Sequence, residues 1–470
     1  MNRAVGNLNK ETLDMVHRHS LHILEQTGIR FTSDETLNVF KKQGFKVHET
    51  TVYFTEKEIL KALENVPAAF TVEARNPSKS IVVGDNHYVV APGYGPPFII
   101  EPSGEKRDAT LSDVHQFCKL VQTSRFLDFN SSIVVHPKDV PSQTAHLDLL
   151  LATLTLTDKP IMGSSVSKEA AMDTLRLAEM VWGDIDSPVM ISLINSLAPL
   201  QYAKEMTEAL IIFAKAGQPV VIHSACTLGV SGPITLAGSL VVSNATTLAG
   251  ICLAQLVRPG TPVVYGLGGS TVNMGTGAYR NASPEDVKHT AIAAAMGSYY
   301  QIPCRGQGAL TESFCLDYQA GMESSMMLTT GALSGVNVGI HACGTYGSML
   351  AMSFEKFLAD EDLCGSIKRL IQPIELTEDA FAIDLIQETG PSGNYLTTDH
   401  TFKRCRNELF DSDFRLSVSH DKWIDIGPEK MIQRVTQMVE NRLASYTKPD
   451  MDPKIEKDLS QYVMRRKNAG

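Results

Sequence analysis

Seven short apolar runs, each followed by a stretch with helical patterning, recur through the middle of this chain. They begin near Ile133, Ile161, Ile191, Val221, Val263, Ile302 and Val338, at intervals of 28, 30, 30, 42, 39 and 36 residues. Such intervals suit one strand–helix unit each, and continuous apolar runs are typical of parallel strands buried on both faces. The rhythm predicts an α/β fold with a (β/α)8 TIM-type barrel, and a doubly wound open sheet is the competing architecture.

The eighth strand of such a barrel has two candidate positions. One is "HYVVAPG" at 87–93, before the series, and the other lies near 370–385, after it. We therefore expect three regions along the 470 residues: an N-terminal α+β cap over 1–107, the barrel over 108–365, and a mostly helical C-terminal extension over 366–470 packed on the barrel.

Charge and composition exclude several classes of function. The net charge of −10 argues against binding to nucleic acid or to anionic membranes, which requires basic patches. We find no apolar core of a signal peptide and no stretch of about 18 uncharged apolar residues. The eight cysteines are scattered without a CxxC motif, which indicates reduced thiols and predicts a cytoplasmic protein.

Polar side chains and glycines follow the apolar runs. The chemistry of a (β/α)8 barrel collects at the carboxyl ends of its strands, so these positions are the candidate site residues. A single polar residue there often caps a neighbouring helix, but several that converge on one face predict a pocket. The candidates at these ends are His136, Ser164, Ser165, Asn195, His223, Arg305, Gln307 and His341.

Two of the strand ends pair a histidine with a cysteine. His223 with Cys226, and His341 with Cys343, have ligand types that zinc prefers, although cysteine is also an ordinary small buried residue. "GLGGSTVNMGTG" at 266–277 has no GxGxxG in register, so dinucleotide binding is not expected. Its residues Gly266, Gly268 and Gly269 would instead let the backbone approach a large flat ligand or a docked partner.

Several longer stretches together resemble the trimethylamine methyltransferase family, in its branch without pyrrolysine. They are "SLHILEQTGIRF", "EARNPSKSIVVG", "SGEKRDATLSDV", "NSLAPL", "YQAGMESSMM", "SFEKFLADEDL" and "GPSGNYLTTDHTFKRCRNELF", and they span about residues 15 to 440. The resemblance implies a barrel enzyme that moves a methyl group from an amine nitrogen to the cobalt of a separate corrinoid protein. This chain contains only standard residues, and the branch without pyrrolysine is similar to enzymes that act on quaternary amines, glycine betaine above all.

The resemblance also suggests roles for the candidate residues. In the implied reaction, Co(I) of the partner's corrinoid attacks an N-methyl group, and the chain supplies positioning rather than a covalent nucleophile. A trimethylammonium group favours aromatic faces, for which Tyr94, Tyr346 and Phe354 are candidates. Arg305 would bind a carboxylate, with Asn195, His223, Gln307 and His341 as further donors, and Gly266, Gly268 and Gly269 would admit the corrinoid.

Other interpretations stay open at this point. Tyr94 and Phe354 are also ordinary core aromatics, and Arg305 is equally suited to neutralising Glu312 or Asp317. Besides the corrinoid-dependent methyltransferase, two functions compete. One is a zinc-dependent barrel methyltransferase or lyase that uses His223, Cys226, His341 and Cys343, and the other is a betaine-binding protein without catalysis. We also expect a homo-oligomer, as is common for large barrel enzymes.

Overall fold

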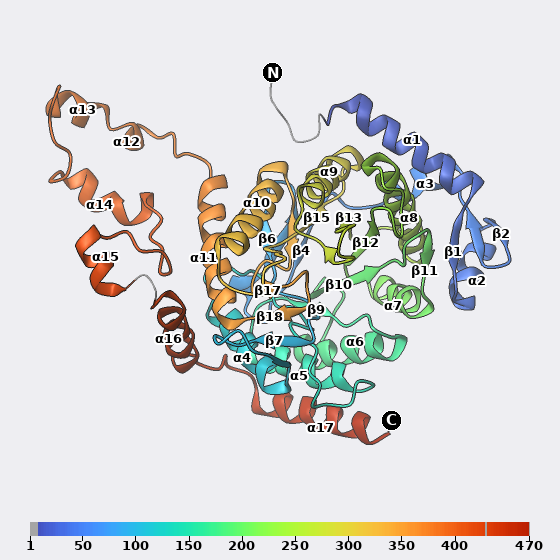
Figure 1. The fold of residues 1–470 in the computed structure, drawn as a ribbon. Helices are drawn as coiled ribbons and strands as arrows, with labels where there is room; N and C mark the ends of the chain where they lie inside the picture. Colours follow the sequence, from blue (N-terminus) through green and yellow to red (C-terminus); the bar gives the residue numbers. More distant parts are fainter. Residues whose placement is uncertain (1–7, 428–429, 470) are drawn as a thin grey trace.

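A computed structural model describes residues 8–427 and 430–469, and its centre is a parallel β-barrel (Figure 1). Neighbouring strands follow the order β9-β10-β12-β13-β15-β16-β6, and every one of these pairings is parallel. The strands are β6 (Val89–Val90), β9 (Ile161–Gly163), β10 (Met190–Asn195), β12 (Val220–Thr227), β13 (Val263–Val272), β15 (Cys304–Gln307) and β16 (Val338–Ile340).

A short extended segment, Asp128–Asn130, closes the ring between β6 and β9. Asn130 forms a parallel bridge with Ile161, and the backbone N–H of Asp128 donates to the carbonyl of Val90 at 3.0 Å. Of the two candidates for the eighth strand, the one before the series is therefore correct, because β6 comes from "HYVVAPG". Residues 370–385 contain no strand.

The predicted strand at Ile133 is wrong, because 128–130 occupies its place in the barrel. Residues 132–135 form a turn and a bend instead. Ile133, Val134 and Val135 are buried in an apolar cluster outside the barrel with side chains from helices α4 (Leu111–Thr123) and α11 (Phe354–Ile371). Their hydrophobicity reflects burial in that helical layer rather than membership of the sheet.

Eight helices follow the eight barrel segments and surround them. Each follows its strand along the chain, in several cases after a long loop or small-sheet strands. Several are capped by side chains, such as Thr110 with Asp113 in a capping box at the start of α4. The helices are α4 (Leu111–Thr123), α5 (Ala145–Leu156), α6 (Lys168–Trp182), α7 (Lys204–Lys215), α8 (Leu236–Val257), α9 (Pro284–Tyr300), α10 (Tyr318–Ser334) and α11 (Phe354–Ile371).

Helix α8 is the one described helix whose length and apolar composition would suffice to cross a membrane, so the expectation that the sequence has no such stretch is wrong. It packs against β12 and β13 on its inner side and against α1 (Lys10–Gln26) and α3 (Glu56–Leu63) on its outer side, so most of it is buried within the fold. Its apolar character therefore has a sufficient explanation in the protein core.

The N-terminal region covers the outside and the amino end of the barrel. Helices α1 (Lys10–Gln26), α2 (Asp34–Lys42) and α3 (Glu56–Leu63) lie on α7, α8 and α9, together with a small sheet of β1 (Ile29–Phe31), β2 (Lys46–His48), β3 (Thr51–Tyr53) and β11 (Gln201–Tyr202). The hairpin of β4 (Ala69–Val72) and β5 (Ile81–Gly84) adds Val72, Ile81 and Val83 to the apolar interior of the barrel.

This hairpin lies at the amino end, since the N–H of Glu73 donates to the carbonyl of Pro188, just before β10. The barrel floor is thus filled, and the carboxyl ends of the strands are the side where a ligand can enter. Because β6 belongs to the barrel, the barrel sheet begins before the predicted boundary between residues 107 and 108. The division of the chain into three regions otherwise stays a prediction.

A second small sheet stands near the carboxyl ends of the strands. Its order is β17-β18-β7-β8, formed by β17 (Thr345–Tyr346), β18 (Ala351–Met352), β7 (Phe98–Ile100) and β8 (Lys106–Asp108). Strand β14 (Tyr279–Arg280) turns back on the end of β13. These strands extend the loops that follow β6, β13 and β16.

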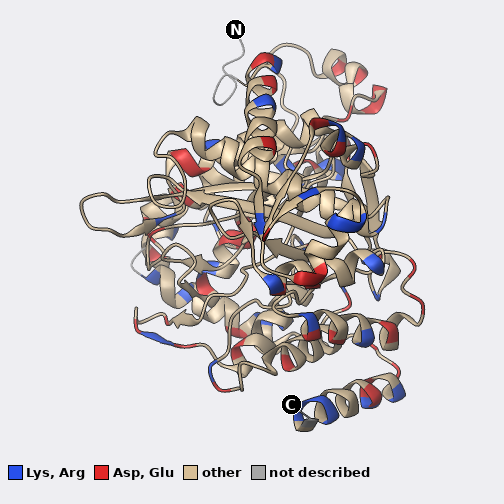
Figure 2. Cartoon of the chain, turned by 90° about the vertical axis from the view of Figure 1, so that its right-hand side faces the viewer, with Lys and Arg blue, Asp and Glu red and all other residues tan. Residues whose placement is uncertain are grey.

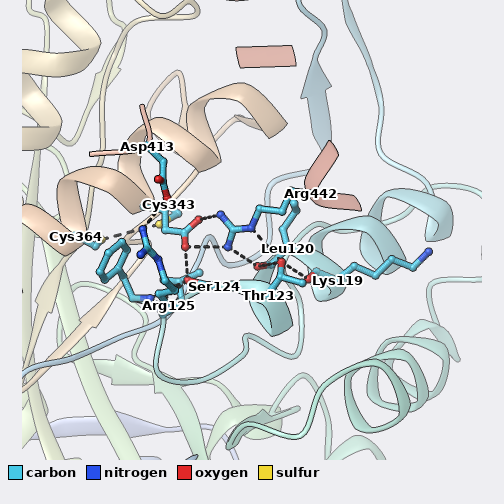
Figure 3. Close-up of polar contacts among 12 residues, drawn as sticks. Lys119, Leu120, Thr123, Ser124, Arg125, Cys343, Cys364, Asp413 and Arg442 are labelled. Atoms are coloured by element: carbon cyan, nitrogen blue, oxygen red, sulfur yellow. Dashed lines mark hydrogen bonds and ion pairs between the residues drawn. The ribbon is translucent and has the colours of Figure 1, made fainter. Parts of the chain in front are cut away.

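The C-terminal region has two parts with different environments. Helices α12 (Glu378–Phe381), α13 (Ile383–Thr389), α14 (Asp399–Glu408) and α15 (His420–Ile426) project from the body (Figure 1). Helices α16 (Met431–Ala444) and α17 (Pro453–Ala469) return to it. Arg442 of α16 pairs with Glu361 of α11 (Figure 3), and Arg466 of α17 lies 2.8 Å from Asp173 of α6.

Basic and acidic residues alternate along the helices in the view of Figure 2, including α17 at the C-terminal end. Many of them pair with each other, as in the ion pair between Lys467 and Asp148 at 2.7 Å. In this view the two signs of charge are interspersed, and no large area carries one sign alone.

Candidate active site

Four neighbouring strands bring their candidate residues to one level of the barrel. The register pairs Asn195 of β10 with His223 of β12, His223 with Gly266 of β13, and Gly266 with Arg305 of β15. Strand alternation sends these side chains inward, because Leu193, Val221 and Val264, two residues earlier in their strands, belong to the apolar interior of the barrel. The polar layer therefore lies directly above the apolar one.

These side chains form one hydrogen-bonded chain. The Arg305 Nη1 donates to His223 Nε2 at 2.8 Å, and the Arg305 Nη2 donates to Gln307 Oε1 at 2.9 Å. Because a guanidinium only donates, His223 Nε2 must be an acceptor, so the proton of the neutral ring sits on Nδ1 and points at Asn195 Oδ1, 3.1 Å away. Burial and the charge of Arg305 keep the pKa of His223 well below its ordinary value, which holds the ring neutral.

Arg305 is a buried cation without a carboxylate partner among the described residues. Its exposed fraction is 2%, its Nε has no hydrogen-bond partner, and burial alone lowers its pKa to about 10. The interpretation that Arg305 neutralises Glu312 or Asp317 is wrong. Glu312 pairs with Arg280 at 3.0 Å, and Asp317 accepts from the N–H of Ala320 as the cap of α10.

His341 faces the same region from the end of β16. Its φ of 67° places a non-glycine residue in the left-handed region, which is uncommon and often marks a functional position. The ring is buried, its Nδ1 has no partner, and burial together with the nearby charge of Arg305 lowers its pKa to about 3. A neutral imidazole with an unused nitrogen therefore lies close to an unpaired guanidinium.

Tyr94 completes this group from the loop after β6. Its ring stands edge-on to His341, with centroids 6.4 Å apart and an angle of 86° between the planes. Burial raises the pKa of Tyr94 to about 12, although the side chains of Ser165 and Ser132 act in the opposite direction. The side chains of Tyr94, Asn195, His223, Arg305, Gln307 and His341 form what we call the strand-end cluster.

Two predicted aromatic residues lie elsewhere. Phe354 stacks on Phe117 with ring centroids 4.2 Å apart, between helices α11 and α4. Tyr346 is buried in a separate small cluster with Ile100 and Ala351 of the neighbouring strands. Both have partners of their own in the helical and small-sheet layers, so Tyr94 is the aromatic candidate that the fold brings next to His341.

The three predicted glycines divide between the two faces of β13. A Cβ on Gly268 would lie 2.7 Å from His223 Nε2, and one on Gly266 would lie 2.8 Å from the carbonyl of Ile222, so both make room for β12 and its histidine. Gly269 points the other way, where a Cβ would meet the ring of His289 on α9. Their role toward a corrinoid stays a prediction.

The zinc site suggested by the two His–Cys pairs is wrong. Cys226 faces Gly232 and Ser239 on the outer side of β12, opposite to His223. Cys343 lies 4.0 Å from Cys364 of α11 (Figure 3), and burial raises the thiol pKa of Cys226 and of Cys343, which disfavours the thiolate that zinc requires. No group of three or more His, Cys, Asp or Glu in the described part of the chain could hold a metal ion.

The sequence patterns did not identify one buried ion pair that supports the site, Lys356 with Asp360. Lys356 of α11 is fully buried, and its Nζ binds Asp360 at 2.5 Å, Ser324 at 3.0 Å and the carbonyl of Ala309 at 3.1 Å. Asp360 in turn accepts from the N–H of Gly344 at 2.8 Å. The pair thus ties together the loops that carry Gln307 and His341. The i,i+4 spacing of Lys356 and Asp360 could have indicated an ion pair from the sequence. Within "SFEKFLADEDL", however, that spacing is typical of an exposed helix face.

Comparison with known proteins agrees with this architecture. The trimethylamine methyltransferase family matches residues 2–470. The chain belongs to this family. It is therefore a methyltransferase, and the resemblance seen in its motifs is confirmed.

Individual relatives are similar over nearly the whole chain. The glycine betaine methyltransferase of Desulfitobacterium hafniense is 37% identical over 98% of this chain and 96% of its own length. The proline betaine:corrinoid methyltransferase of Eubacterium limosum is 31% identical over 96% of each chain. The solved structure of the Methanosarcina barkeri monomethylamine methyltransferase shares the fold, with a TM-score of 0.50 at 14% identity over 94% of each chain.

Proposed function

We propose that this chain transfers an N-methyl group from a carboxylated quaternary amine to the cobalt of a separate corrinoid protein. Glycine betaine, which would leave as dimethylglycine, is the substrate we infer first. Relatives named for glycine betaine and proline betaine support the class of substrate. The strand-end cluster supports it independently.

The observation that carries this proposal is the unpaired guanidinium of Arg305. Leaving a buried cation without a counter-ion is unfavourable, and the substrate carboxylate would supply the missing charge. The Nε of Arg305 and the Nδ1 of His341 are buried without a hydrogen-bond partner, so both atoms are free to bind the substrate. The neutral rings of His223 and His341 leave Arg305 as the charge that selects an anion.

The opposite end of a betaine needs a surface that attracts a cation without hydrogen bonds. The face of Tyr94 is suited to a trimethylammonium group, because the electron density of an aromatic ring attracts such cations. In the transfer, the electrons of the broken C–N bond stay on nitrogen, so a neutral tertiary amine departs and no side chain has to protonate it. Positioning is then the main contribution of the chain.

The rim around the strand ends fits a docked partner. Exposed apolar side chains follow β9, β10, β12, β13 and β15, namely Val166, Leu197, Val230, Ile234, Met274 and Phe314. A corrinoid bound by the partner would supply the Co(I) nucleophile that accepts the methyl group. Apolar loops at the mouth would exclude water from the reacting atoms, which suits a nucleophile that water can protonate.

Calorimetric titration of the purified protein with glycine betaine, dimethylglycine, trimethylamine and carnitine tests the substrate. Binding of a betaine, with weaker binding of trimethylamine, which has no carboxylate, is the expected result. Turnover is then measured with a Co(I) corrinoid protein by the loss of Co(I) absorbance. Binding of a betaine without turnover would favour the betaine-binding protein instead, and no binding of any carboxylated amine would contradict the assignment to Arg305.

A further inference from the structure

Asn281 is the one described residue whose side chain has two buried polar atoms and pairs neither of them. It follows β14 directly, its exposed fraction is 0%, and both Oδ1 and Nδ2 lack a hydrogen-bond partner. An unpaired buried amide is unfavourable, because each of its groups has lost the hydrogen bonds that water would make. This position therefore suits a ligand that completes those hydrogen bonds.

A second asparagine shows how the fold treats an amide that it uses for itself. Asn244 of α8 is also 0% exposed. Its Nδ2 donates to the hydroxyl groups of Ser20 and Tyr300, each at 2.9 Å, and its Oδ1 accepts from the hydroxyl of Tyr265 at 2.8 Å. The amide of Asn244 is thus fully paired within the chain, whereas that of Asn281 is not.

Strand pairing places Asn281 beside Ser270. The antiparallel register of β13 and β14 sets Arg280 opposite Thr271, so the next residue of each strand brings Asn281 next to Ser270. Side chains at opposite positions of an antiparallel pair share one face of the sheet. The face on which Ser270 lies is therefore also the face of Asn281.

Ser270 lies on the inner face of the barrel. Gly268, two residues earlier, is on that face, because a Cβ there would lie 2.7 Å from His223 Nε2. Alternation gives Ser270 the same side. Its hydroxyl oxygen lies 2.8 Å from that of Thr227, the paired residue of β12. Asn281 thus belongs to the side of β13 that carries the strand-end cluster.

The layer above the strand-end cluster is open and has small side chains. On β12 the inward residues Ala225 and Thr227 are half-exposed, whereas Cys226, which faces outward, is buried. Their partners on β13 are Gly268 and Ser270. A small ligand therefore has room in this layer.

The height of this layer matches the length of a short betaine. Arg305 Nη1 lies 2.8 Å from His223 Nε2, so the guanidinium is at the level of Gly268. Ser270 is two residues further along, and two residues of a strand span about 6.6 Å. A carboxylate on the guanidinium fills the first part of this distance, and the adjoining methylated nitrogen reaches the level of Asn281.

We propose that Asn281 binds both charged ends of the substrate and selects betaines with a single carbon between carboxylate and nitrogen. The inference rests on the proposed function and specifies its substrate class. Nδ2 donates to a carboxylate oxygen, and Oδ1 faces the N-methyl hydrogens, which carry part of the positive charge.

The shape of the amide explains the selection. Its donor and acceptor are attached to one carbon, so they reach both charges of a zwitterion only when these charges are close together. Glycine betaine and proline betaine have one carbon between the charges, and carnitine has three. A longer betaine held by Arg305 places its nitrogen beyond the amide of Asn281, and one contact is lost.

Calorimetric titration of the full-length chain tests the selection. Asn281→Leu keeps the size of the side chain and removes both polar atoms. Its affinity for glycine betaine should fall by about 10- to 100-fold, the usual effect of losing a hydrogen bond to a charged group. The affinity for 4-trimethylammoniobutanoate, which has three carbons between the charges, should change much less.

A second variant separates binding from structure by the sign of its effect. Asn281→Asp keeps an acceptor and replaces the donor by a negative charge. It should weaken glycine betaine, whose carboxylate it repels, and should strengthen choline, which has the same trimethylammonium group and no carboxylate. A purely structural asparagine would affect both ligands alike.

Urea denaturation gives a readout that needs no ligand. Asn281→Leu should leave the free energy of unfolding unchanged or raise it, because no partner in the chain loses a hydrogen bond. Asn244→Leu is the matched control and should lower it, since three hydroxyl groups lose their partner.

Three results would overturn the inference while the proposed function holds. One is wild-type affinity of Asn281→Leu for glycine betaine, as expected if only water completes the amide. Another is an equal loss for the short and the long betaine. The third is a fall in stability as large as that of Asn244→Leu. If the wild-type chain binds no betaine at all, the proposed function fails first and takes this inference with it.

Discussion

Two buried cations of this protein have opposite surroundings. Lys356 in α11 is enclosed by Asp360, the hydroxyl of Ser324 and the carbonyl of Ala309. Arg305 in β15 donates to His223 and Gln307, which are both neutral, and faces no carboxylate among the described residues. A fold satisfies a cation that it uses for its own stability. We infer that the cation left unsatisfied, at the open end of the barrel, is held ready for a ligand.

The largest effect, on the free energy of unfolding, is expected when Lys356 is replaced. Lys356→Met keeps the length of the side chain but leaves Asp360 buried without its counter-ion. Breaking one partner of a buried pair costs about 3–5 kcal/mol, so the free energy of unfolding should fall by about that amount. Urea denaturation followed by circular dichroism measures it. As a control, Lys168→Met removes a half-exposed pair with Glu35 and should cost about 0–1 kcal/mol.

Replacement of Arg305 should instead affect ligand binding and have little effect on the free energy of unfolding. Arg305→Gln is expected to leave the free energy of unfolding unchanged or slightly higher, because no buried carboxylate loses its partner. Its affinity for glycine betaine should fall by about 2–5 kcal/mol, the usual effect of deleting one side of a buried charge pair. Calorimetry with glycine betaine and with choline, which has no carboxylate, separates the two contributions. An equal loss for both ligands would show that Arg305 acts on something other than the carboxylate.

The pH dependence of stability offers a third comparison, since burial, together with the charge of Arg305, lowers the pKa of His341. The pKa of His341 is about 3 in the folded protein, below the ordinary value of 6.5, so the unfolded chain binds the additional proton between these values. Stability from this group is complete above pH 6.5 and is lost as the pH falls, at up to about 1.4 kcal/mol per pH unit.

His341→Gln removes this contribution and should flatten the loss of thermal stability between pH 6.5 and 4. His223 and His289 have lowered pKa values as well, while the pKa of Asp286 is raised to about 7, which acts in the opposite direction. The comparison is therefore made between variant and wild type at each pH. Identical profiles for the two proteins would contradict the assignment to His341.

The sequence predicted the barrel and most of this site for a simple physical reason. Strand alternation and the common carboxyl end of parallel strands place Asn195, His223 and Arg305 together once the strands are found. The misplaced strand at Ile133 and the core position of Phe354 have one cause. Apolar residues signal burial, and the sequence does not say whether a strand, a helical layer or a ligand covers them.

The remaining features depend on backbone geometry and on distant contacts. His341 follows Val338 and Ile340, whose side chains point into the barrel, and strand alternation would turn it outward. Its positive φ departs from strand geometry, and nothing in the local pattern predicts this conformation. Lys356 and Asp360 have the spacing of a surface pair, and their burial results from the packing of α10 against α11.

The smallest effect concerns the aromatic face that would accompany Arg305. Tyr94→Leu should weaken glycine betaine binding by about 1–2 kcal/mol, because a cation–π contact in a desolvated site has about that value. Phe354→Leu is the matched control, since it removes an aromatic ring that stacks on Phe117 away from the strand-end cluster. It should lower stability and leave the affinity unchanged. Equal affinities for the two variants would mean that the unpaired cation alone selects the substrate, and that the trimethylammonium group binds without Tyr94.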